Sequence, residues 1–208
     1  MEKNAESWEN DYSRRGRIWG GAVHDLPDIL PGHAVLELGC GNGKTFSALL
    51  NRGCTVTGID FSKSAAIMCS RNNRVFPGSH VVIADAGILP FAASSFDEII
   101  ACHIVGHLDK RGRGSLVRES FRVLKPGGSL YFSGFSTEDF RAGNGIEQEP
   151  GTFVRKNGIS THYFTETEVR DLFAGYGSSR ITTSRWALTV RGRQYPRAEI
   201  IAQFKKEC

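Results

Sequence analysis

The sequence lacks any paired pattern of cysteines. It contains 5 cysteines, an odd number, and no two of them form a CxxC pair. A disulfide framework is therefore disfavoured, and so is a cysteine-rich zinc site. Three of the thiols fall in or beside predicted strands or a glycine-rich turn, which indicates reduced, mostly buried cysteines in a reducing compartment. The five positions are Cys40, Cys54, Cys69, Cys102 and Cys208.

Long apolar stretches are also absent. No run reaches the roughly 20 residues that a membrane-spanning helix needs, and residues 1–4 lack the basic start of a secretory signal. We therefore expect no membrane segment and a cytoplasmic protein. The chain has 208 residues, of which 40% are hydrophobic, and neither repeats nor low-complexity tracts interrupt it. This size predicts a single domain over 1–208.

A strong excess of one charge is missing as well. The 26 basic and 22 acidic residues give a formal net charge of +4, and the basic residues are scattered except in 111–118 and after 191. Such a weak excess is typical of a solvated surface and does not indicate a nucleic-acid partner. The pattern favours no particular oligomeric state.

What the chain does have is a short apolar strand, Val35–Leu38, that runs into a glycine-rich turn and then into a helix beginning near Lys44. The bare turn leaves backbone amides free, and the helix start adds partial positive charge. The glycines are spaced GxGxG, not GxGxxG as in dinucleotide sites, and Glu37 precedes them. A carboxylate there repels phosphate and favours a ligand with a cationic end, such as S-adenosylmethionine (SAM). The alternative is a purely structural tight turn.

A second strand, Thr55–Asp60, ends in a carboxylate about 20 positions after the glycines, where it can accept both ribose hydroxyls of an adenosine. Alternatively, Asp60 helps to cap a helix that starts near Ser62. Phe61, between these two residues, would either lie flat against adenine or pack in the core.

A third strand, Val81–Ala84, is followed by Asp85 and Ala86. The Asp85 carboxylate can accept a hydrogen bond from the exocyclic amine of adenine. The backbone N–H of Ala86 can donate one to a ring nitrogen. Together with the preceding strand end, this predicts specificity for adenine. A fourth strand is expected over Phe96–Ala101.

The rest of the chain continues the alternation of helices and strands. Helical spacing or capping residues predict helices over 62–73, over 109–124 and after Thr165. Lys125–Gly128 cannot continue a helix and leads into a strand over 129–133. Two last strands, 180–190 and 198–204, are expected to form an antiparallel hairpin.

Five motifs, taken in order, resemble the class I SAM-dependent methyltransferases, in particular small single-domain members of type 11 or 25: LELGCGNG, GIDFS, ADAGILPF, SFDEIIA and LKPGGSLYFSGF. The resemblance implies an α/β fold, a Rossmann-like three-layer sandwich whose seven-stranded sheet is mostly parallel with an antiparallel C-terminal hairpin. It also implies SAM as methyl donor, S-adenosylhomocysteine (SAH) as product, and direct displacement. The residues predicted to bind the cofactor are Tyr12, Trp19, Glu37, Gly39, Cys40, Gly41, Asp60, Phe61, Asp85, Ala86 and His103.

Two segments are expected to cover the site. The N-terminal segment, 1–32, carries Trp8, Tyr12 and Trp19, and exposing so much aromatic surface would be costly. We interpret it as a lid, in which Tyr12 and Trp19 touch the methionine end of the cofactor by resemblance; the alternative is that they plug the core. The glycine-rich segment 136–163 is interpreted as an insertion over the substrate site.

No catalytic residue is assigned, because displacement at a sulfonium mainly requires alignment and a dry pocket. If the acceptor needs deprotonation, His103 and His107 are the best candidates, and His162 is a weaker one. His107 is better explained as structural. The spacing of the first two histidines lacks the glutamate of HExxH, so we expect no metal site.

The acceptor is predicted to be a small molecule. Enzymes that methylate exocyclic or amide nitrogens in nucleic acid or protein often carry an acidic or Asn residue, two prolines and an aromatic after the fourth strand, whereas this chain reads ACHIV at 101–105. Cys102 follows alanine rather than the proline of cytosine-C5 enzymes, so we interpret it as a packing residue.

Two other readings stay open at this point. A macromolecular methyltransferase, acting on RNA or protein, predicts an open, basic groove beside His103 that recruits Arg111, Arg113 and Arg118. A nicotinamide (NAD)-dependent oxidoreductase is disfavoured by the glycine spacing.

Overall fold

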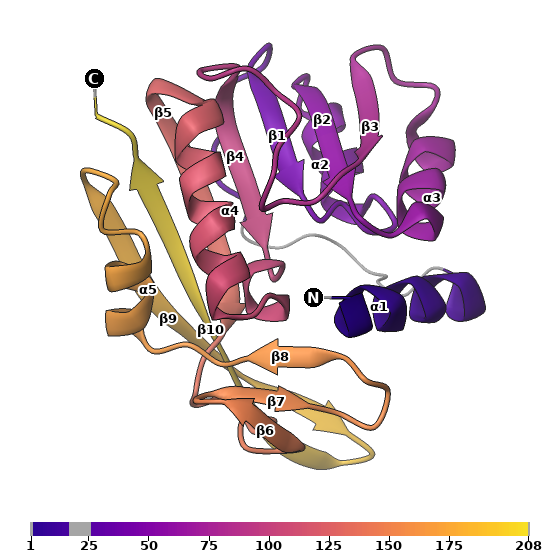
Figure 1. Cartoon of the computed structure of the whole chain (residues 1–208), viewed down its shortest axis with the longest axis vertical. Helices are drawn as coiled ribbons and strands as arrows, with labels where there is room; N and C mark the ends of the chain where they lie inside the picture. Colours follow the sequence, from indigo (N-terminus) through magenta and orange to yellow (C-terminus); the bar gives the residue numbers. More distant parts are fainter. Residues whose placement is uncertain (1, 17–25, 208) are drawn as a thin grey trace.

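The computed structural model describes residues 2–16 and 26–207, and a seven-stranded sheet forms its centre (Figure 1). The strands of this sheet are β1 (Ala34–Leu38), β2 (Thr55–Asp60), β3 (Ser79–Ile83), β4 (Phe96–Cys102), β5 (Leu124–Phe135), β9 (Ser179–Val190) and β10 (Arg193–Lys205). Their order is β3-β2-β1-β4-β5-β10-β9. The first five are parallel, and β10 and β9 are each antiparallel to the preceding neighbour. This confirms the predicted Rossmann-like sheet and its C-terminal hairpin.

Helices connect the strands of the sheet. They are α1 (Glu2–Arg15), α2 (Lys44–Asn51), α3 (Lys63–Asn73), the short 3-10 helix η1 (Val105–His107), α4 (Lys110–Val123) and α5 (Glu166–Leu172). The predicted helix starts at Ser62, Asp109 and Thr165 are N-caps, because each side chain accepts a hydrogen bond from the backbone N–H three residues on. In the part of the chain that the structure describes, no helix is long and apolar enough to span a bilayer.

Apolar side chains build a core on each face of the sheet. Leu36 of β1 packs with the layer of α4 and α5, where Leu116 and Val169 are fully buried. The neighbouring Val35 points to the other face and packs with Phe46 of α2. Because successive strand residues alternate between faces, both sides of β1 are apolar and both are covered. The result is the predicted three-layer sandwich.

The residues Lys125–Gly128, which were expected to separate a helix from the fifth strand, form a bulge inside a longer strand. Helix α4 passes directly into β5, which begins at Leu124 rather than near Ser129. The register of β4 against β5 shifts between Phe96 and Glu98, so the intervening residues of β5 loop out without ending the strand.

The segment predicted as an insertion, 136–163, contains a second, antiparallel sheet. Its strands are β6 (Ile146–Glu149), β7 (Thr152–Val154) and β8 (Ser160–His162). Figure 1 shows this small sheet beyond the carboxyl ends of the parallel strands, at the same end of the molecule as α1. The buried His162 ring joins it to α5 by contacts of 2.7 Å with Thr152 Oγ1 and with Glu168 Oε1.

Candidate active site

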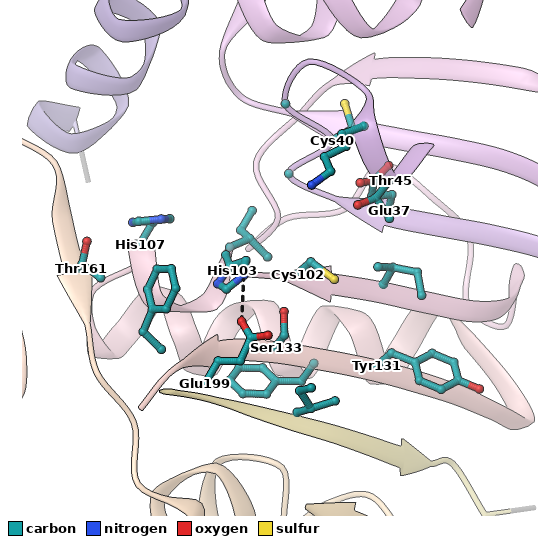
Figure 2. A pocket seen from close by; sticks show the side chains of 18 of the residues that line it. Glu37, Cys40, Thr45, Cys102, His103, His107, Tyr131, Ser133, Thr161 and Glu199 are labelled. Atoms are coloured by element: carbon teal, nitrogen blue, oxygen red, sulfur yellow. Dashed lines mark ion pairs between the residues drawn. The ribbon is translucent and has the colours of Figure 1, made fainter. Parts of the chain in front are cut away.

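A half-open cavity of about 1050 Å³ lies at the carboxyl ends of β1, β2 and β4 and continues over β5, β10 and β9. Residues of α1 and β8 border it, and Figure 2 shows the glycine turn on one side and β5 and β10 on the other. This is the edge at which ligands bind in open α/β sheets. The predicted cofactor residues that line it are Tyr12, Glu37, Gly39, Cys40, Gly41, Asp60, Phe61 and His103.

Asp85 and Ala86 are not among the lining residues, although they follow β3 as expected. Asp85 is exposed, and its Oδ1 accepts a hydrogen bond of 2.7 Å from the backbone N–H of Gly87, which holds the carboxylate in its own turn. Trp19 lies outside the described residues. The cofactor contacts of these three residues stay predictions, as do those of the residues that line the cavity.

The glycine turn has a backbone that other residues rarely adopt. Gly39 and Gly41 have φ angles of 69° and 53°. A Cβ atom at Gly41 would lie 2.5 Å from Oη of Tyr12, and one at Gly39 would lie 2.8 Å from Cδ1 of Ile104. The turn is therefore in close contact with α1 and with the segment after β4, and side chains at these two positions would collide with both.

Glu37 brings a buried carboxylate beside this turn (Figure 2). Glu37 is only 4% exposed, and its Oε2 has no hydrogen-bond partner among the described residues. Burial raises the pKa of Glu37 well above its usual value. An unpartnered carboxylate oxygen that lines a cavity fits a ligand with a cationic or hydrogen-donating end, as SAM has.

Asp60, at the tip of β2, is held by two backbone donors. Oδ2 accepts a hydrogen bond from Gly41 N–H and Oδ1 accepts one from Ser62 N–H, both at 2.9 Å. Burial nevertheless raises the pKa of Asp60 to about 6. The hydroxyl of Ser62, and not Asp60, is the N-cap of α3, because it accepts from Ala65 N–H at 3.1 Å. This leaves the Asp60 carboxylate facing the cavity.

Helix α1 lies across the cofactor end of the cavity and is attached near its start and at its middle. Glu9 accepts hydrogen bonds from Ser62 Oγ at 2.7 Å and from Ser64 Oγ at 2.5 Å, at the start of α3. Asn4 donates to the His107 carbonyl and accepts from Ser160 N–H at 3.1 Å. The lid interpretation of 1–32 stays a prediction, because part of that segment lies outside the described residues.

Tyr12, for which the sequence left open a cofactor contact or a role in the core, lies on α1 beside Trp8. Trp8 and Tyr12 line the cavity and are also buried, in a small cluster that includes Ala65 and Ile159, with Phe61 packed against it. They therefore pack as a core and border the cavity at the same time.

His103 is the candidate base that keeps an accessible ring in the cavity. Its φ is 60°, an uncommon value for a residue with a side chain, and its ring lies against Phe135 with a centroid distance of 4.5 Å. Nε2 lies 3.3 Å from Oε2 of Glu199 on β10 (Figure 2). Nδ1 has no partner among the described residues. The ring is 39% exposed, so it is open to a ligand.

The other two histidines are structural. Half-buried His107 borders the cavity, but its Nδ1 lies 2.7 Å from the carbonyl oxygen of Ser160, and burial lowers the pKa of His107 to about 4, which makes it a poor base. His162 is outside the cavity lining and is held in the junction with α5. Within the described ranges, no group of three potential ligand residues is arranged for a metal ion.

Cys102 fits the packing role that the sequence predicted. Burial raises the pKa of its thiol to about 12, so the thiol stays protonated near neutral pH. A protonated thiol is a weak nucleophile. The cavity therefore offers no activated cysteine at this position.

The half of the cavity away from the glycine turn is rich in arginine and aromatic residues that the sequence reading missed. They are Phe135, Arg141, Arg155, Arg180, Trp186 and Arg197. The polar and aromatic residues at alternate positions of 180–186 were an available signal, because alternate residues of a strand share one face. The other positions come from segments that only the folded sheet brings together.

The arginines expected to form a basic groove lie elsewhere. Arg113 is buried on α4, where its Nη1 lies 2.8 Å from Oε1 of Glu149 and holds the small sheet in place. Arg118 donates to Ser115 of its own helix at 2.9 Å. Neither these two nor Arg111 line the cavity. The expectation was wrong because it treated neighbours in sequence as neighbours at the site.

The sheet order, the bare turn and the acidic strand ends fit a SAM-dependent methyltransferase, and the comparisons with known proteins show that class, EC 2.1.1.-. The chain belongs to the class I SAM-dependent methyltransferases, and the family model described as "Methyltransferase domain" matches residues 36–132. SAM is accordingly its cofactor, and the oxidoreductase reading is abandoned.

Relatives and a solved structure extend this match. The tRNA N(3)-methylcytidine methyltransferase trm141 of Schizosaccharomyces pombe is 26% identical over 93% of this chain and 87% of that protein. Mettl2 of Drosophila melanogaster, with the same enzyme name, is 30% identical over 86% of this chain, which spans only 60% of its length. A SAM-dependent methyltransferase of Methanosarcina mazei has a TM-score of 0.71 and 26% identity, covering 89% of this chain and 100% of its own.

Proposed function

We propose that this enzyme transfers the methyl group of SAM to a base in RNA. The observation that carries the proposal is the lining of the cavity beside His103, where arginine and aromatic side chains occur together. Guanidinium groups bind phosphates, and aromatic rings stack on bases, so this combination suits nucleotides. The two tRNA methyltransferases, which match most of this chain, support the same acceptor class.

The residues at the glycine turn are assigned to the cofactor. We assign the carboxylate of Asp60 to the ribose hydroxyls, Glu37 to the cationic end of SAM, and the bare backbone of Gly39–Gly41 to close contact with the cofactor. The unpartnered oxygen of Glu37 and the left-handed backbone of Gly39 and Gly41, which line the cavity, support this arrangement. Asp85 and Ala86 are assigned to the adenine at the rim.

The bound cofactor supplies an electrophilic methyl group on a sulfonium. The chain contributes alignment of the acceptor and exclusion of water, for which α1 and β8 form the walls. If the acceptor atom carries a proton, His103, oriented by Glu199, is the side chain placed to accept it. An acceptor nitrogen with a free lone pair requires no base.

A small-molecule acceptor is the second candidate. The observation that favours it is the closure of the cavity by α1, which is tied to α3 through Glu9 and to β8 through Asn4. Once SAM occupies part of a cavity of about 1050 Å³, the rest has the size of an ordinary ligand pocket, which spans roughly 300–1000 Å³.

Transfer of a tritiated methyl group from SAM distinguishes the two candidates. The enzyme is incubated with transfer RNA and, in parallel, with a filtered extract of small metabolites. The RNA proposal predicts acid-precipitable label that ribonuclease releases and that appears in one methylated nucleoside. Label confined to the metabolite fraction would refute the RNA proposal in favour of a small molecule.

A further inference from the structure

Two arginines from distant parts of the chain share one buried carboxylate at the wall of the cavity. The Asp139 side chain is 0% exposed. Its Oδ1 and Oδ2 accept hydrogen bonds from Nε and Nη2 of Arg141, at 2.7 and 3.1 Å. Oδ2 also accepts from Nε of Arg197 on β10, at 2.6 Å. The carboxylate therefore fixes both guanidinium groups.

The arrangement has one positive charge more than Asp139 neutralises. Burial alone would raise the pKa of Asp139, but the hydrogen bonds from both arginines hold it below its usual value, so Asp139 is ionised. One arginine would balance this carboxylate. The second leaves a net positive charge in a place where the two side chains are only 19% and 14% exposed, for Arg141 and Arg197 respectively.

The guanidinium groups have donors left for a ligand. Both terminal amino groups of Arg197, and Nη1 of Arg141, have no hydrogen-bond acceptor among the residues that the structure describes. Both arginines line the cavity, and both lie over the ring of Phe135, at 3.9 and 5.3 Å from its centroid. These contacts hold the two groups in place before any ligand arrives.

The nearby charges are compatible with an anion. The one acidic residue of the lining on this part of β10, Glu199, is paired with His103 at 3.3 Å. Arg155, across the cavity, donates to the neutral Oη of Tyr163 at 2.7 Å. Arginines of the lining, namely Arg141, Arg155, Arg180 and Arg197, outnumber the acidic groups of this half, Glu199 and the buried Asp139, so the field there is positive.

We propose that Arg141 and Arg197, positioned by Asp139, form a phosphate-binding subsite that holds a phosphate of the acceptor strand beside His103. This inference rests on the proposed function, because an RNA acceptor brings such a group next to every base. The planar guanidinium fork matches the paired oxygens of a phosphate. The subsite would fix the position of the acceptor base relative to SAM.

The test is calorimetric titration of the SAH-loaded protein with inorganic phosphate, and separately with acetate, at constant ionic strength. Phosphate is expected to bind at one site and more tightly than acetate. Arg141→Gln and Arg197→Gln should each weaken phosphate binding about tenfold or more, because each removes charge-assisted hydrogen bonds. The matched control is Arg185→Gln, since Arg185 is exposed, paired with Glu138 and outside the cavity lining.

The subsite is refuted if wild-type protein does not bind phosphate, if acetate binds as tightly, or if the control weakens binding as much as the two variants. Circular dichroism checks that each variant is folded, and Arg197→Lys, which keeps the charge, should retain more affinity than Arg197→Gln. The RNA proposal can fail while the subsite stands. In that case the enzyme would label only small molecules, and phosphate binding would still depend on Arg197. The subsite would then bind an anionic metabolite.

Discussion

The backbone N–H of Gly41 donates a hydrogen bond of 2.9 Å to Oδ2 of Asp60. This bond joins the glycine turn after β1 to the acidic tip of β2. It means that the shape of the turn and the orientation of the carboxylate are fixed together. A change in the ionisation of Asp60 should therefore change the affinity of the site for its cofactor.

The affinity for SAH should fall as the pH is lowered below about 6. Burial raises the pKa of Asp60 to about 6 in the free chain, whereas ribose hydroxyls bind its ionised form. Below that pH the group must lose a proton to bind SAH, so affinity decreases by up to about tenfold per pH unit, and above it the curve flattens. Calorimetry in two buffers should detect the released proton.

The control for this pH dependence is Asp60→Asn, which has no proton to lose. Its SAH affinity should be lower near neutral pH and should depend less on pH between about 5 and 7. Glu37, whose pKa burial also raises, is the other buried carboxylate of the site and is tested in the same way with Glu37→Gln. An unchanged slope in Asp60→Asn would assign the pH dependence to another group.

Loss of the Glu9 contacts should speed the release of SAH. Glu9 accepts hydrogen bonds from the side chains of Ser62 and Ser64, so it ties α1 to the start of α3. Glu9→Gln should raise the dissociation rate about threefold to tenfold, as expected for a weakened charge-assisted contact. Stopped-flow fluorescence measures the rate. The control, Glu6→Gln, changes an exposed residue on the same helix and should have no effect.

Removal of the Cys102 thiol should leave methyl transfer intact. Burial raises the pKa of this thiol to about 12, so no thiolate is present to attack the acceptor. Cys102→Ala should keep the initial rate within about twofold, since direct displacement needs no covalent intermediate. Complete loss of transfer in a folded Cys102→Ala protein, with SAH affinity preserved, would point to a nucleophilic cysteine.

Gly58→Ala should destabilise the fold. A Cβ atom there would lie 2.8 Å from Cε2 of Phe46 and 2.9 Å from Cβ of Cys40, so the core between β2 and α2 must shift. Urea denaturation should show a loss of about 1–3 kcal/mol in the free energy of unfolding. Gly175→Ala is the control, because no atom lies within 4 Å of the added methyl. Equal stability of both variants would contradict this packing.

The parts of the fold that the sequence predicted depend on local chemistry. Buried strands such as Val35–Leu38 are short, mainly apolar runs, and the caps at Ser62, Asp109 and Thr165 are side chains that accept hydrogen bonds from amides three residues away. The glycine turn and Asp60 could be predicted as neighbours because each follows the carboxyl end of a strand, and the two strands are adjacent and parallel. The strands of the small sheet, only 3 or 4 residues long, carry too few positions to show a period.

The acceptor half of the cavity was missed because its residues meet only in the folded chain. Arg197 reaches Asp139 across 58 positions of sequence, through the pairing of β10 with β5. The prediction of a basic groove from Arg113 failed for the same reason, since its charge is used inside the protein by Glu149. Charge in a sequence window does not reveal which face of the fold will carry it.

The central claim is that the glycine turn and the carboxylates at the ends of β1 and β2 hold the cofactor. It is tested most directly by calorimetric titration of wild-type protein and Asp60→Ala with SAH and with NAD. We predict one SAH site per chain, affinity at least about tenfold weaker in Asp60→Ala, and no binding of NAD. Equal SAH affinity in the two proteins, or tighter binding of NAD than of SAH, would contradict the account.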